Sequence, residues 1–421
     1  MRSLKRLSEV ECRFIYGRRT LPRSFGTVSG ESCKSNGLMI FRFRLCWQKW
    51  EQNAGQGLTY HVRAISLPRM ERLMRALQLT DYKRLEMVNL PVPDPDDDEV
   101  LIAVRACGIC GSDVHGYDGS TGRRIPPLVM GHEAAGTVAA VGRSVTAFSE
   151  GDRVTFDSTV YCGKCFFCER GERNLCDARE VVGVSTPQFR RMGAFAEYIA
   201  VPGRIVHRLP DEMPFAHAAL IEAVSVAVHA VSLSKIQLDD TAVIVGAGMI
   251  GLLTLQAALR AGAGTAIVLD LDDTRLALAQ KMGATRVFNA KREGVASEIL
   301  ELTQGRGADI AVECVGTGPA VALAIESVRK GATVTLVGNV APKIEVGLQS
   351  IVTRQLRLQG SCASAGEYPA SIALMSRGAI QVEGLLSAVA PLEEGAAWFD
   401  RLYRREPGLM KVVLQPGMAI S

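Results

Sequence analysis

Four cysteines lie close together in one short stretch of the chain. They form the pattern C-x2-C-x2-C-x7-C at Cys162, Cys165, Cys168 and Cys176. Four thiolates at this spacing match a closed tetrahedral zinc site, which leaves no position for a substrate. We therefore predict a structural zinc ion that holds this loop. An iron–sulfur cluster, a zinc module that binds nucleic acid, and surface thiols without a metal are the alternatives.

A glycine-rich loop offers a second kind of chemistry. The sequence Gly246-Ala-Gly-Met-Ile-Gly251 has the form G-x-G-x-x-G, follows an apolar run and opens an expected helix. In that context the first glycine permits a tight turn, Gly248 lets the backbone approach a pyrophosphate, and the third lets helix and strand pack closely. The phosphates would sit at the helix N-terminus, where free N–H groups favour anions. A glycine turn in an ordinary α/β sheet is the alternative.

Acidic residues indicate which dinucleotide binds. Asp270 ends the next expected strand, 19 residues after Gly251, and Asp272 and Asp273 follow it. A carboxylate at that place accepts hydrogen bonds from the adenosine ribose, and three acids would repel a 2′-phosphate, so the sequence favours NAD over NADP. The predicted cofactor site comprises Gly246, Gly248, Met249, Ile250, Gly251, Asp270, Arg275 and Gly338.

Two kinds of domain must position these motifs. Residues 74–220 contain short apolar runs separated by turns, whereas strands and helices alternate over 223–363, which indicates a parallel sheet. The fold class is therefore α/β, with a β-rich domain beside a doubly wound parallel sheet. The expected strands are 99–106, 136–142, 151–156, 241–246, 265–270, 308–315 and 332–338, and the expected helices are 250–261 and one that ends near Met282. Lys411–Leu414 resembles a closing strand that returns to the first domain.

Another set of candidate metal ligands follows the first expected strand. Cys110-Gly-Ser-Asp-Val-His115 comes first, and the run 131–145 matches the pattern G-H-E-x2-G-x5-G-x2-V completely. A lone Cys or His would usually be a core residue, but these motifs stand together in a fixed order. With them, the chain over about residues 74–416 resembles the zinc-containing medium-chain alcohol/polyol dehydrogenase family. The resemblance implies a GroES-like catalytic domain at 70–222 and 364–421, and a Rossmann domain at 223–363.

The resemblance also implies a catalytic zinc site, and hence two zinc ions per chain. Cys110 and His132 correspond to zinc ligands, and Glu133 corresponds to a near or transient ligand. Some family members carry a further Cys before the dinucleotide domain, whereas this chain offers Glu222, as in the polyol dehydrogenase branch. Ala223 departs from that branch, which often has Pro there. An acid favoured by a helix N-terminus is the alternative for Glu222.

The chemistry that the resemblance implies is hydride transfer from an alcohol. An open zinc position takes the substrate hydroxyl and lowers its pKa, and hydride passes to the nicotinamide. Ser112 carries the hydroxyl that the family uses to remove the proton, and His115 corresponds to a relay histidine of some members. A turn hydroxyl and an exposed histidine are the alternatives. Arg123 and Arg124 could meet a phosphate or carboxylate, but we favour solvated loop charges.

The N-terminal segment differs from the rest of the chain. Residues 1–69 hold 13 Lys and Arg against 4 Asp and Glu, and the remaining residues hold 35 against 40, so the main body does not suggest a nucleic-acid partner. A transit-like leader would be Arg-rich, but Glu9, Glu11, Glu31 and Glu51 weaken that interpretation. We expect 1–69 to be a poorly ordered extension, upstream of a natural start at Met70 or Met74.

The sequence thus predicts an enzyme that oxidises a secondary alcohol, a polyol or vicinal diol, with zinc and NAD. A dehydrogenase of threonine, another amino alcohol or a butanediol is the first alternative. A zinc-independent reductase would lack these motifs, and a non-catalytic binding protein would be expected to lose Cys110, His132 or Glu222. The chain has no run of 18 apolar residues, so we expect no membrane span. Its cysteine usage fits the reducing cytoplasm, and we expect a homodimer or homotetramer.

Overall fold

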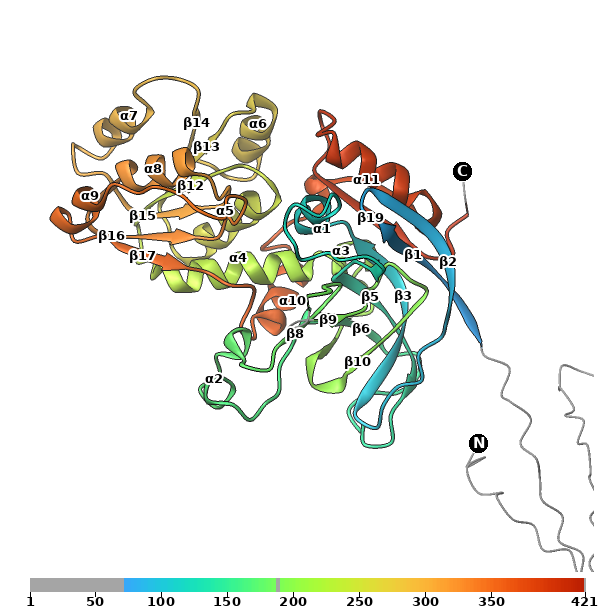
Figure 1. Cartoon of the computed structure of the whole chain (residues 1–421). Helices are drawn as coiled ribbons and strands as arrows, with labels where there is room; N and C mark the ends of the chain where they lie inside the picture. Colours follow the sequence, from blue (N-terminus) through green and yellow to red (C-terminus); the bar gives the residue numbers. More distant parts are fainter. Residues whose placement is uncertain (1–71, 187–189, 420–421) are drawn as a thin grey trace, which may run out of the picture. The chain divides into compact units, whose positions relative to one another are not determined.

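The computed structural model describes residues 72–186 and 190–419 (Figure 1). The expected extension at 1–69 lies outside the described residues. The parts before about residue 215 and after about 385 build three sheets. The largest has seven strands on the path β11-β6-β5-β3-β19-β18, with β10 paired to β3, and the two smaller sheets run β2-β1-β4 and β7-β8-β9.

These strands have the following bounds: β1 Leu73–Asp81, β2 Arg84–Pro91, β3 Glu99–Gly108, β4 Leu128–Val129, β5 Glu133–Val141, β6 Arg153–Phe156, β7 Thr159–Val160, β8 Glu180–Val182, β9 Arg190–Arg191, β10 Tyr198–Pro202, β11 Val206–Arg208, β18 Leu386–Pro391 and β19 Lys411–Gln415. The pairing of β19 joins the two ends of the described chain, because Val413 lies antiparallel to Gly108 of β3. The predicted closing strand is therefore confirmed. The sequence did not indicate β2.

A six-stranded sheet occupies the middle of the chain. All its pairs are parallel, and its order β14-β13-β12-β15-β16-β17 is that of a doubly wound Rossmann sheet. Its strands are β12 Thr241–Val245, β13 Thr265–Asp270, β14 Arg286–Asn289, β15 Ala308–Glu313, β16 Val328–Leu336 and β17 Arg357–Gly360. The predicted fold class is confirmed. Strand β16 begins four residues before the expected strand at 332.

Helices cover both faces of this sheet (Figure 1). The α-helices are α1 Gly111–Gly116, α2 Phe166–Glu169, α3 Phe215–Ala218, α4 Ile221–Ser234, α5 Met249–Ala261, α6 Asp273–Lys281, α7 Val295–Leu302, α8 Gly318–Ser327, α9 Leu348–Thr353, α10 Tyr368–Ser376 and α11 Gly395–Tyr403. Short 3-10 turns lie at η1 Arg173–Leu175, η2 Gly203–Ile205, η3 Glu383–Leu385 and η4 Leu392–Glu394.

The central strand β12 shows why both faces need cover. Ala242 and Ile244 belong to one hydrophobic core with α4 and α5, whereas Val243 and Val245 belong to another with α7 and α8. Successive side chains of a strand point to opposite faces, so a run of apolar residues requires a helix layer on each side. Helix α5 begins directly after the glycine loop and ends at Gly262, which has a φ of 116°. These two glycine positions fix where α5 starts and stops.

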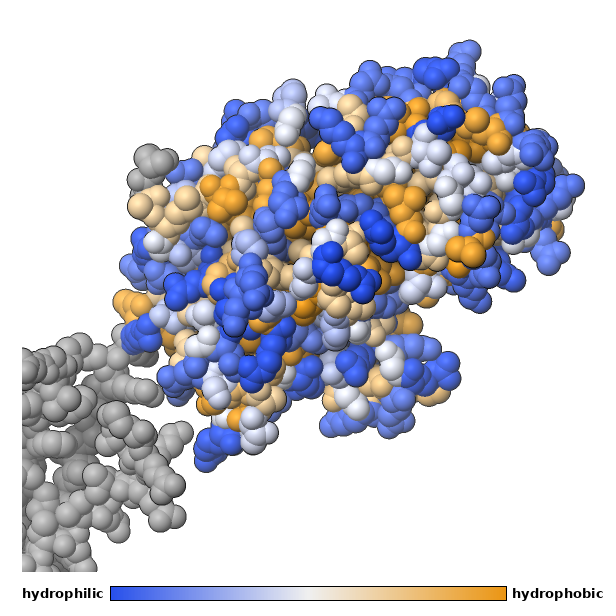
Figure 2. Space-filling model, turned by 180° about the vertical axis from the view of Figure 1, so that it is seen from behind, coloured by the Kyte–Doolittle hydropathy of each residue, from blue (hydrophilic) through white to orange (hydrophobic). Residues whose placement is uncertain are grey.

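One stretch of the described residues, Phe215–Ser234, is long and apolar enough to cross a membrane by length and composition. In the structure this stretch contains α3 and α4, and 61% of its most apolar window is buried. The core helix of a soluble protein has the same properties. On the face shown in Figure 2, hydrophobic side chains are scattered among hydrophilic ones, as on an ordinary water-exposed surface.

Candidate functional site

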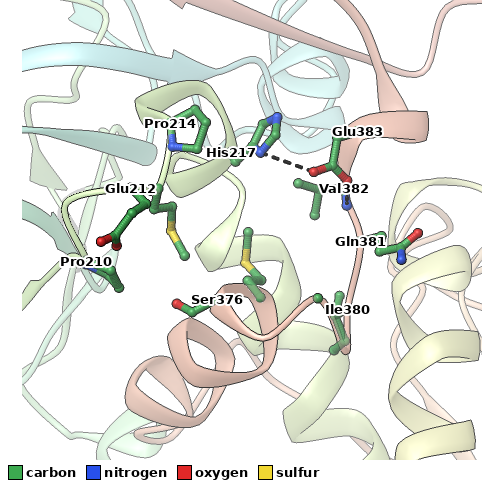
Figure 3. Close-up of a pocket in the computed structure, with 12 residues that line it drawn as sticks. Pro210, Glu212, Pro214, His217, Ser376, Ile380, Gln381, Val382 and Glu383 are labelled. Carbon is green, nitrogen blue, oxygen red and sulfur yellow. Dashed lines mark hydrogen bonds and ion pairs between the residues drawn. The ribbon is translucent and has the colours of Figure 1, made fainter.

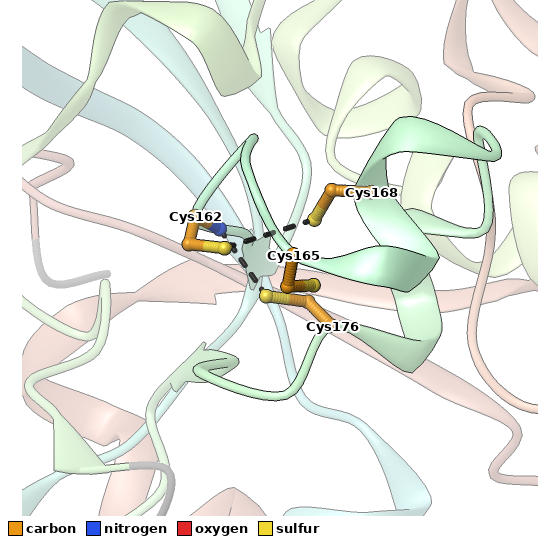
Figure 4. Close-up of side chains that lie close together, drawn as sticks. All are labelled: Cys162, Cys165, Cys168 and Cys176. Atoms are coloured by element: carbon orange, nitrogen blue, oxygen red, sulfur yellow. Dashed lines mark hydrogen bonds between the residues drawn. The ribbon is translucent and has the colours of Figure 1, made fainter.

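The four cysteines converge in a lobe between β7 and β8 (Figure 4). Their Sγ atoms all lie within 4.8 Å of one another, and the atoms of Cys162 and Cys168 are 4.0 Å apart. Four tetrahedral Zn–S bonds of about 2.3 Å would place sulfur atoms about 3.8 Å apart, so the thiols fit one zinc ion. The amides of Cys168 and Asp177 lower the pKa of Cys165 to about 6, which favours the thiolate that a metal needs.

A second cluster lies where β3 ends and β5 begins in the seven-stranded sheet; His132 and Glu133 are buried and Cys110 is partly exposed. The thiol of Cys110, the imidazole of His132 and the carboxylate of Glu133 lie within 4.8 Å of one another. Cys110 precedes α1, and His132 and Glu133 stand at the start of β5, which pairs with β3. Soft and borderline donors of this kind suit zinc. The chemistry of the donor set therefore fits the metal that the motifs predicted.

Glu133 has a partner that the sequence did not indicate. Both of its carboxylate oxygens accept hydrogen bonds from Lys411 of β19, at 2.9 and 2.7 Å, and both side chains are almost fully buried. Gly108 provides the room, because a Cβ atom there would lie 2.3 Å from Glu133 Oε2. The Lys411 ammonium compensates the charge of a carboxylate that directly follows His132.

Helix α4 places Glu222 in the same buried region, although its carboxylate lies outside the group formed by Cys110, His132 and Glu133. Ser158 Oγ donates to Glu222 Oε1 at 3.4 Å. Burial raises the pKa of Glu222 to about 7, and the neighbouring His132 opposes that rise. Glu133 therefore lies closer to Cys110 and His132 than Glu222 does. Glu222 stands in the first turn of α4.

Two side chains of α1, Ser112 and Asp113, lie next to the imidazole of His132. Its Nδ1 lies 3.5 Å from Asp113 Oδ1, and its Nε2 lies 3.5 Å from Ser112 Oγ. Burial alone would lower the pKa of His132, but Asp113 and Cys110 raise it well above its ordinary value. Ser112 Oγ is also 3.3 Å from Cys110 Sγ, so the predicted proton-handling hydroxyl does lie beside the predicted ligands.

Arg124 corrects the sequence-based interpretation. We expected Arg123 and Arg124 to be solvated loop charges, and Arg123 is exposed. Arg124 is only 4% exposed, and its guanidinium donates to Asp113 at 3.1 and 2.9 Å. An arginine is buried only when its charge is paired, and a charged carboxylate in the interior supplies that partner here.

The glycine loop has the predicted backbone. Gly246 has a φ of 100°, which L side chains rarely adopt, and a Cβ atom at Gly251 would lie 1.7 Å from the Gly246 carbonyl oxygen. A Cβ atom at Gly248 would meet nothing within 4 Å. The tight turn and the close helix–strand packing are confirmed, and open space lies next to Gly248.

The acids beside this loop differ from expectation in one respect. Asp270 accepts hydrogen bonds from Ala247 N at 2.6 Å and Leu271 N at 2.7 Å, which ties the glycine loop to the end of β13. The carboxylate of Asp272 caps α6, and that of Asp273 accepts from Asn289. All three acids therefore have partners within the chain. Asp270 and Asp272 nevertheless line the cleft, so the expectation that acids here would repel a 2′-phosphate stays a prediction.

One cleft of about 1570 Å³ lies beside the dinucleotide loop, and Cys110, Ser112, His132, Glu133 and Glu222 are not among the residues that line it. It is lined on one side by Gly246, Gly248, Asp270 and Arg275, and on the other by Ile109, Gly111 and His115. Met249, Ile250 and Gly338 do not line it; Gly338 packs against the backbone of Gly316 instead. His115 is exposed in this cleft. The dinucleotide loop and the chain that begins the Cys110 motif thus face the same space.

Comparison with known proteins agrees with this geometry. Residues 96–211 match the family model of the alcohol dehydrogenase GroES-like domain, and 250–377 match that of zinc-binding dehydrogenases. The chain is 37% identical over 347 residues to sorbitol dehydrogenase of Bacillus subtilis (strain 168), covering 82% of this chain and 97% of that protein. It is 34% identical over 353 residues to D-arabitol-phosphate dehydrogenase of Enterococcus avium, covering 82% and 98%.

Among solved structures, the chain is similar to a zinc-binding dehydrogenase from Sinorhizobium meliloti 1021 bound to NADP. The TM-score is 0.75 at 31% sequence identity, and the match covers 82% of this chain and 100% of that one. The chain belongs to the zinc-containing alcohol/polyol dehydrogenase family. It is accordingly a zinc-dependent oxidoreductase that uses a nicotinamide dinucleotide and acts on a small-molecule alcohol.

The sequence analysis did not assign Asp113 or Lys411 to the site of this dehydrogenase, and it placed Arg124 in solvent. Asp113 lies inside the Cys110 motif, and its spacing gave the only local signal, since it follows the cysteine by three residues. Lys411 stands 278 residues from Glu133, so nothing local could pair them. A lysine that opens an apolar strand was the one hint, because a charge buried in a core needs a partner.

A separate pocket of about 200 Å³ lies between the α3 region and the chain after α10 (Figure 3). His217 and Glu383 face each other across it, at 3.5 Å. None of the predicted site residues of the dehydrogenase lines this pocket.

Proposed function

We propose that this enzyme oxidises secondary alcohol groups of polyols or vicinal diols with NAD, and that each chain holds two zinc ions. The proposal rests on the cluster of Cys110, His132 and Glu133. The two chain neighbours of Cys110, Ile109 and Gly111, line the same cleft as the dinucleotide loop. Cys162, Cys165, Cys168 and Cys176 would hold the structural ion. Cys110, His132 and a glutamate, Glu133 or Glu222, would hold the catalytic one.

The catalytic chemistry follows from the groups around the cluster. When bound, zinc polarises the substrate hydroxyl and the nicotinamide accepts a hydride. Ser112 Oγ, 3.5 Å from His132 Nε2, would receive the hydroxyl proton, and the exposed His115 in the cleft would pass it towards solvent. Lys411 would keep Glu133 charged and oriented while it competes with the metal for the same carboxylate.

A site with a carboxylate near the metal is harder and more hydrophilic than one with thiolates alone. It should suit a substrate that presents two neighbouring oxygens. Polar groups that meet a second hydroxyl are left unpaired by a simple alcohol, so discrimination should be large. Similarity to a sorbitol and an arabitol-phosphate dehydrogenase supports the polyol class.

The test is a substrate panel measured as kcat/KM with NAD under one set of conditions. We expect sorbitol-like polyols or a butanediol to exceed ethanol by about 100-fold or more. Ethanol that matches every diol would contradict the polyol class. Threonine as the best substrate would identify the amino-alcohol alternative and leave the zinc and dinucleotide assignments in place.

NAD preference is proposed on Asp270, whose carboxylate lines the cleft at the end of β13. The variant Asp270→Asn with Leu271→Arg should shift preference towards NADP, because it removes a repulsive charge and adds a phosphate partner. Asparagine keeps an oxygen for the Ala247 amide, so the glycine loop should stay in place. A wild-type enzyme with higher kcat/KM for NADP than for NAD would contradict this proposal.

We further propose that the enzyme is a cytoplasmic homodimer or homotetramer, with the domain limits 70–222, 223–363 and 364–421. The eight cysteines of the described residues are all free thiols, which supports a reducing compartment. Strand β17 is an edge of the Rossmann sheet, and exposed apolar side chains precede it at Val340, Val346, Leu348 and Val352. Unpaired edges and exposed apolar residues favour self-association, and light scattering of the purified enzyme would measure it.

A further inference from the structure

Arg124 lies behind the catalytic cluster in a place prepared for it. The side chain crosses α1 next to Gly116, where a Cβ atom would lie only 2.3 Å from Arg124 Cγ and 3.0 Å from its Cβ. Any larger residue at position 116 would displace the arginine. The arginine is 4% exposed, so its charge depends on the groups that it touches.

Two side chains of the Cys110 motif receive that charge. Asp113 Oδ1 accepts from Arg124 Nε at 3.1 Å and Nη2 at 2.9 Å, and Ser112 Oγ accepts from Nη2 at 3.3 Å. Asp113 is fully buried, and the same Oδ1 atom lies 3.5 Å from His132 Nδ1. One carboxylate oxygen therefore faces both the guanidinium and the imidazole.

Each contact restricts a group that handles the reacting atoms. His132 Nδ1 makes no hydrogen bond with any described residue, and the Asp113 carboxylate at 3.5 Å is its charged neighbour. A carboxylate beside Nδ1 favours the tautomer that leaves Nε2 for the metal and restricts the orientation of the ring. A hydroxyl has one hydrogen and two acceptor positions. Because Ser112 Oγ accepts from Arg124, its own hydrogen must point away from the guanidinium, and it points to Cys110 Sγ at 3.3 Å. The second acceptor position of Ser112 Oγ then remains for the hydroxyl proton of a substrate.

We propose that Arg124 is a positioning residue of this dehydrogenase, which orients His132 through Asp113 and aims the hydroxyl of Ser112. The proposal rests on the proposed assignment of His132 as a zinc ligand and Ser112 as the proton acceptor. It requires a contact that the family motifs do not contain: one guanidinium must donate hydrogen bonds to two residues of α1, Ser112 and Asp113. A lysine, with a point charge, can satisfy only part of that geometry.

The experiment compares Arg124→Met with Arg123→Met, its exposed neighbour. Three quantities are measured: kcat with a polyol and NAD, KM for NAD, and the rate at which a chelator removes the first zinc ion from the purified enzyme. For Arg124→Met we expect kcat to fall by about 10- to 100-fold and catalytic zinc to leave about 10- to 100-fold faster, with KM for NAD within about twofold. Arg123→Met should match the wild type in all three.

Rescue separates positioning from a general loss of structure. Guanidinium ion added to Arg124→Ala should restore part of kcat, because the space beside Asp113 then admits it, and the same ion should not accelerate Arg123→Met. If Arg124→Met does not fold, Gly116→Ala takes its place, since the added methyl group displaces Arg124 without removing it. The proposal is overturned if the variant that does fold keeps both its kcat and its rate of zinc release within about twofold of wild type.

Failure of the underlying function would look different. An enzyme that binds one zinc ion, or that keeps its activity as His132→Ala, would overturn the catalytic zinc assignment. Two zinc ions and an inactive His132→Ala, together with an Arg124→Met that behaves like Arg123→Met, would overturn only the role of Arg124.

Discussion

The two metal-competent clusters of this enzyme are built in opposite ways. The cysteine lobe takes all its ligands from one short loop, and three of its four cysteines remain partly exposed. In the catalytic cluster His132 and Glu133 are buried and Cys110 is partly exposed, and the supporting groups come from α1, β5, α4 and β19. A local loop needs the metal to hold it together, whereas the catalytic cluster is held by the fold and by charge pairs before any metal binds.

The comparison predicts where substitutions act. In the lobe, loss of a ligand should affect the loop and little else. In the catalytic cluster, loss of a ligand should affect the reaction, and loss of a supporting charge should affect both stability and reaction. Each variant below tests one side of this difference, from the largest expected effect on turnover to the smallest.

Replacement of a predicted catalytic ligand should have the largest effect. Cys110→Ser and His132→Ala remove a zinc ligand, and a loss of about 4 kcal/mol or more of transition-state stabilisation lowers kcat/KM by about 1000-fold or more. NAD binding, measured by the quenching of protein fluorescence, should stay within about threefold because the glycine loop belongs to the other domain. Activity within tenfold of wild type in both variants would refute the assignment.

Lys411→Met should come next, because it leaves Glu133 as an unpaired buried charge. Such a change costs about 3–5 kcal/mol in the free energy of unfolding. The double variant Lys411→Met/Glu133→Gln removes both charges and should recover most of that stability. Urea unfolding of the two variants measures this, and equal destabilisation of single and double variants would show that the pair is not compensating the Glu133 charge.

The sequence predicted the parts of the site that depend on spacing and missed those that depend on the fold. The cysteine lobe and the glycine loop are local, so motif and context were enough to find them, and the strand that carries Lys411 was expected as well. The pairing of Lys411 with Glu133 was not, because it requires β19 to lie beside β3. The burial of Arg124 depends on the space left by Gly116, and a pattern of charged residues in the sequence does not reveal that space. The helix cap formed by Asp272 was not predicted, although an Asp directly before a helix commonly acts as its N-cap.

Cys165→Ser should leave the reaction nearly unchanged. It removes one of four ligands of the lobe, so we expect loss of one zinc ion per chain and faster proteolytic cleavage within residues 162–176, with kcat per remaining zinc within about twofold. Metal analysis and limited proteolysis measure these effects. The exposed neighbour Lys164→Met is the matched control. A Cys165→Ser enzyme that folds but loses most of its kcat would mean that the two clusters are not independent.

The smallest effect on turnover is expected at Asn174, which connects the two regions. It lies in the lobe, and its Nδ2 atom is 2.7 Å from the Cys362 carbonyl oxygen and 3.4 Å from His229 Nε2 on α4. His229 in turn contacts Glu367 through Nδ1 at 2.7 Å. Since Nδ1 donates to that carboxylate, a neutral His229 presents Nε2 as an acceptor, and Asn174 supplies the donor.

Asn174→Ala leaves two acceptors without their donor, one of which belongs to the buried His229, and this costs about 1–3 kcal/mol in the free energy of unfolding. The kcat should stay within about twofold because Glu222 lies two turns away on α4. The control is Glu169→Gln, at an exposed residue of the lobe, and it should unfold like wild type.

Combining Asn174→Ala with Cys165→Ser tests the comparison between the two regions. If the metal holds the loop that presents Asn174, the double variant should lose less stability than the two single losses added together, because Cys165→Ser has already released that contact. If the losses of unfolding free energy in the two single variants add up to the loss in the double variant, Asn174 is held in place by the rest of the fold and not by the metal-bound loop. Asn174 would then belong to the region of the catalytic cluster and not to the cysteine lobe.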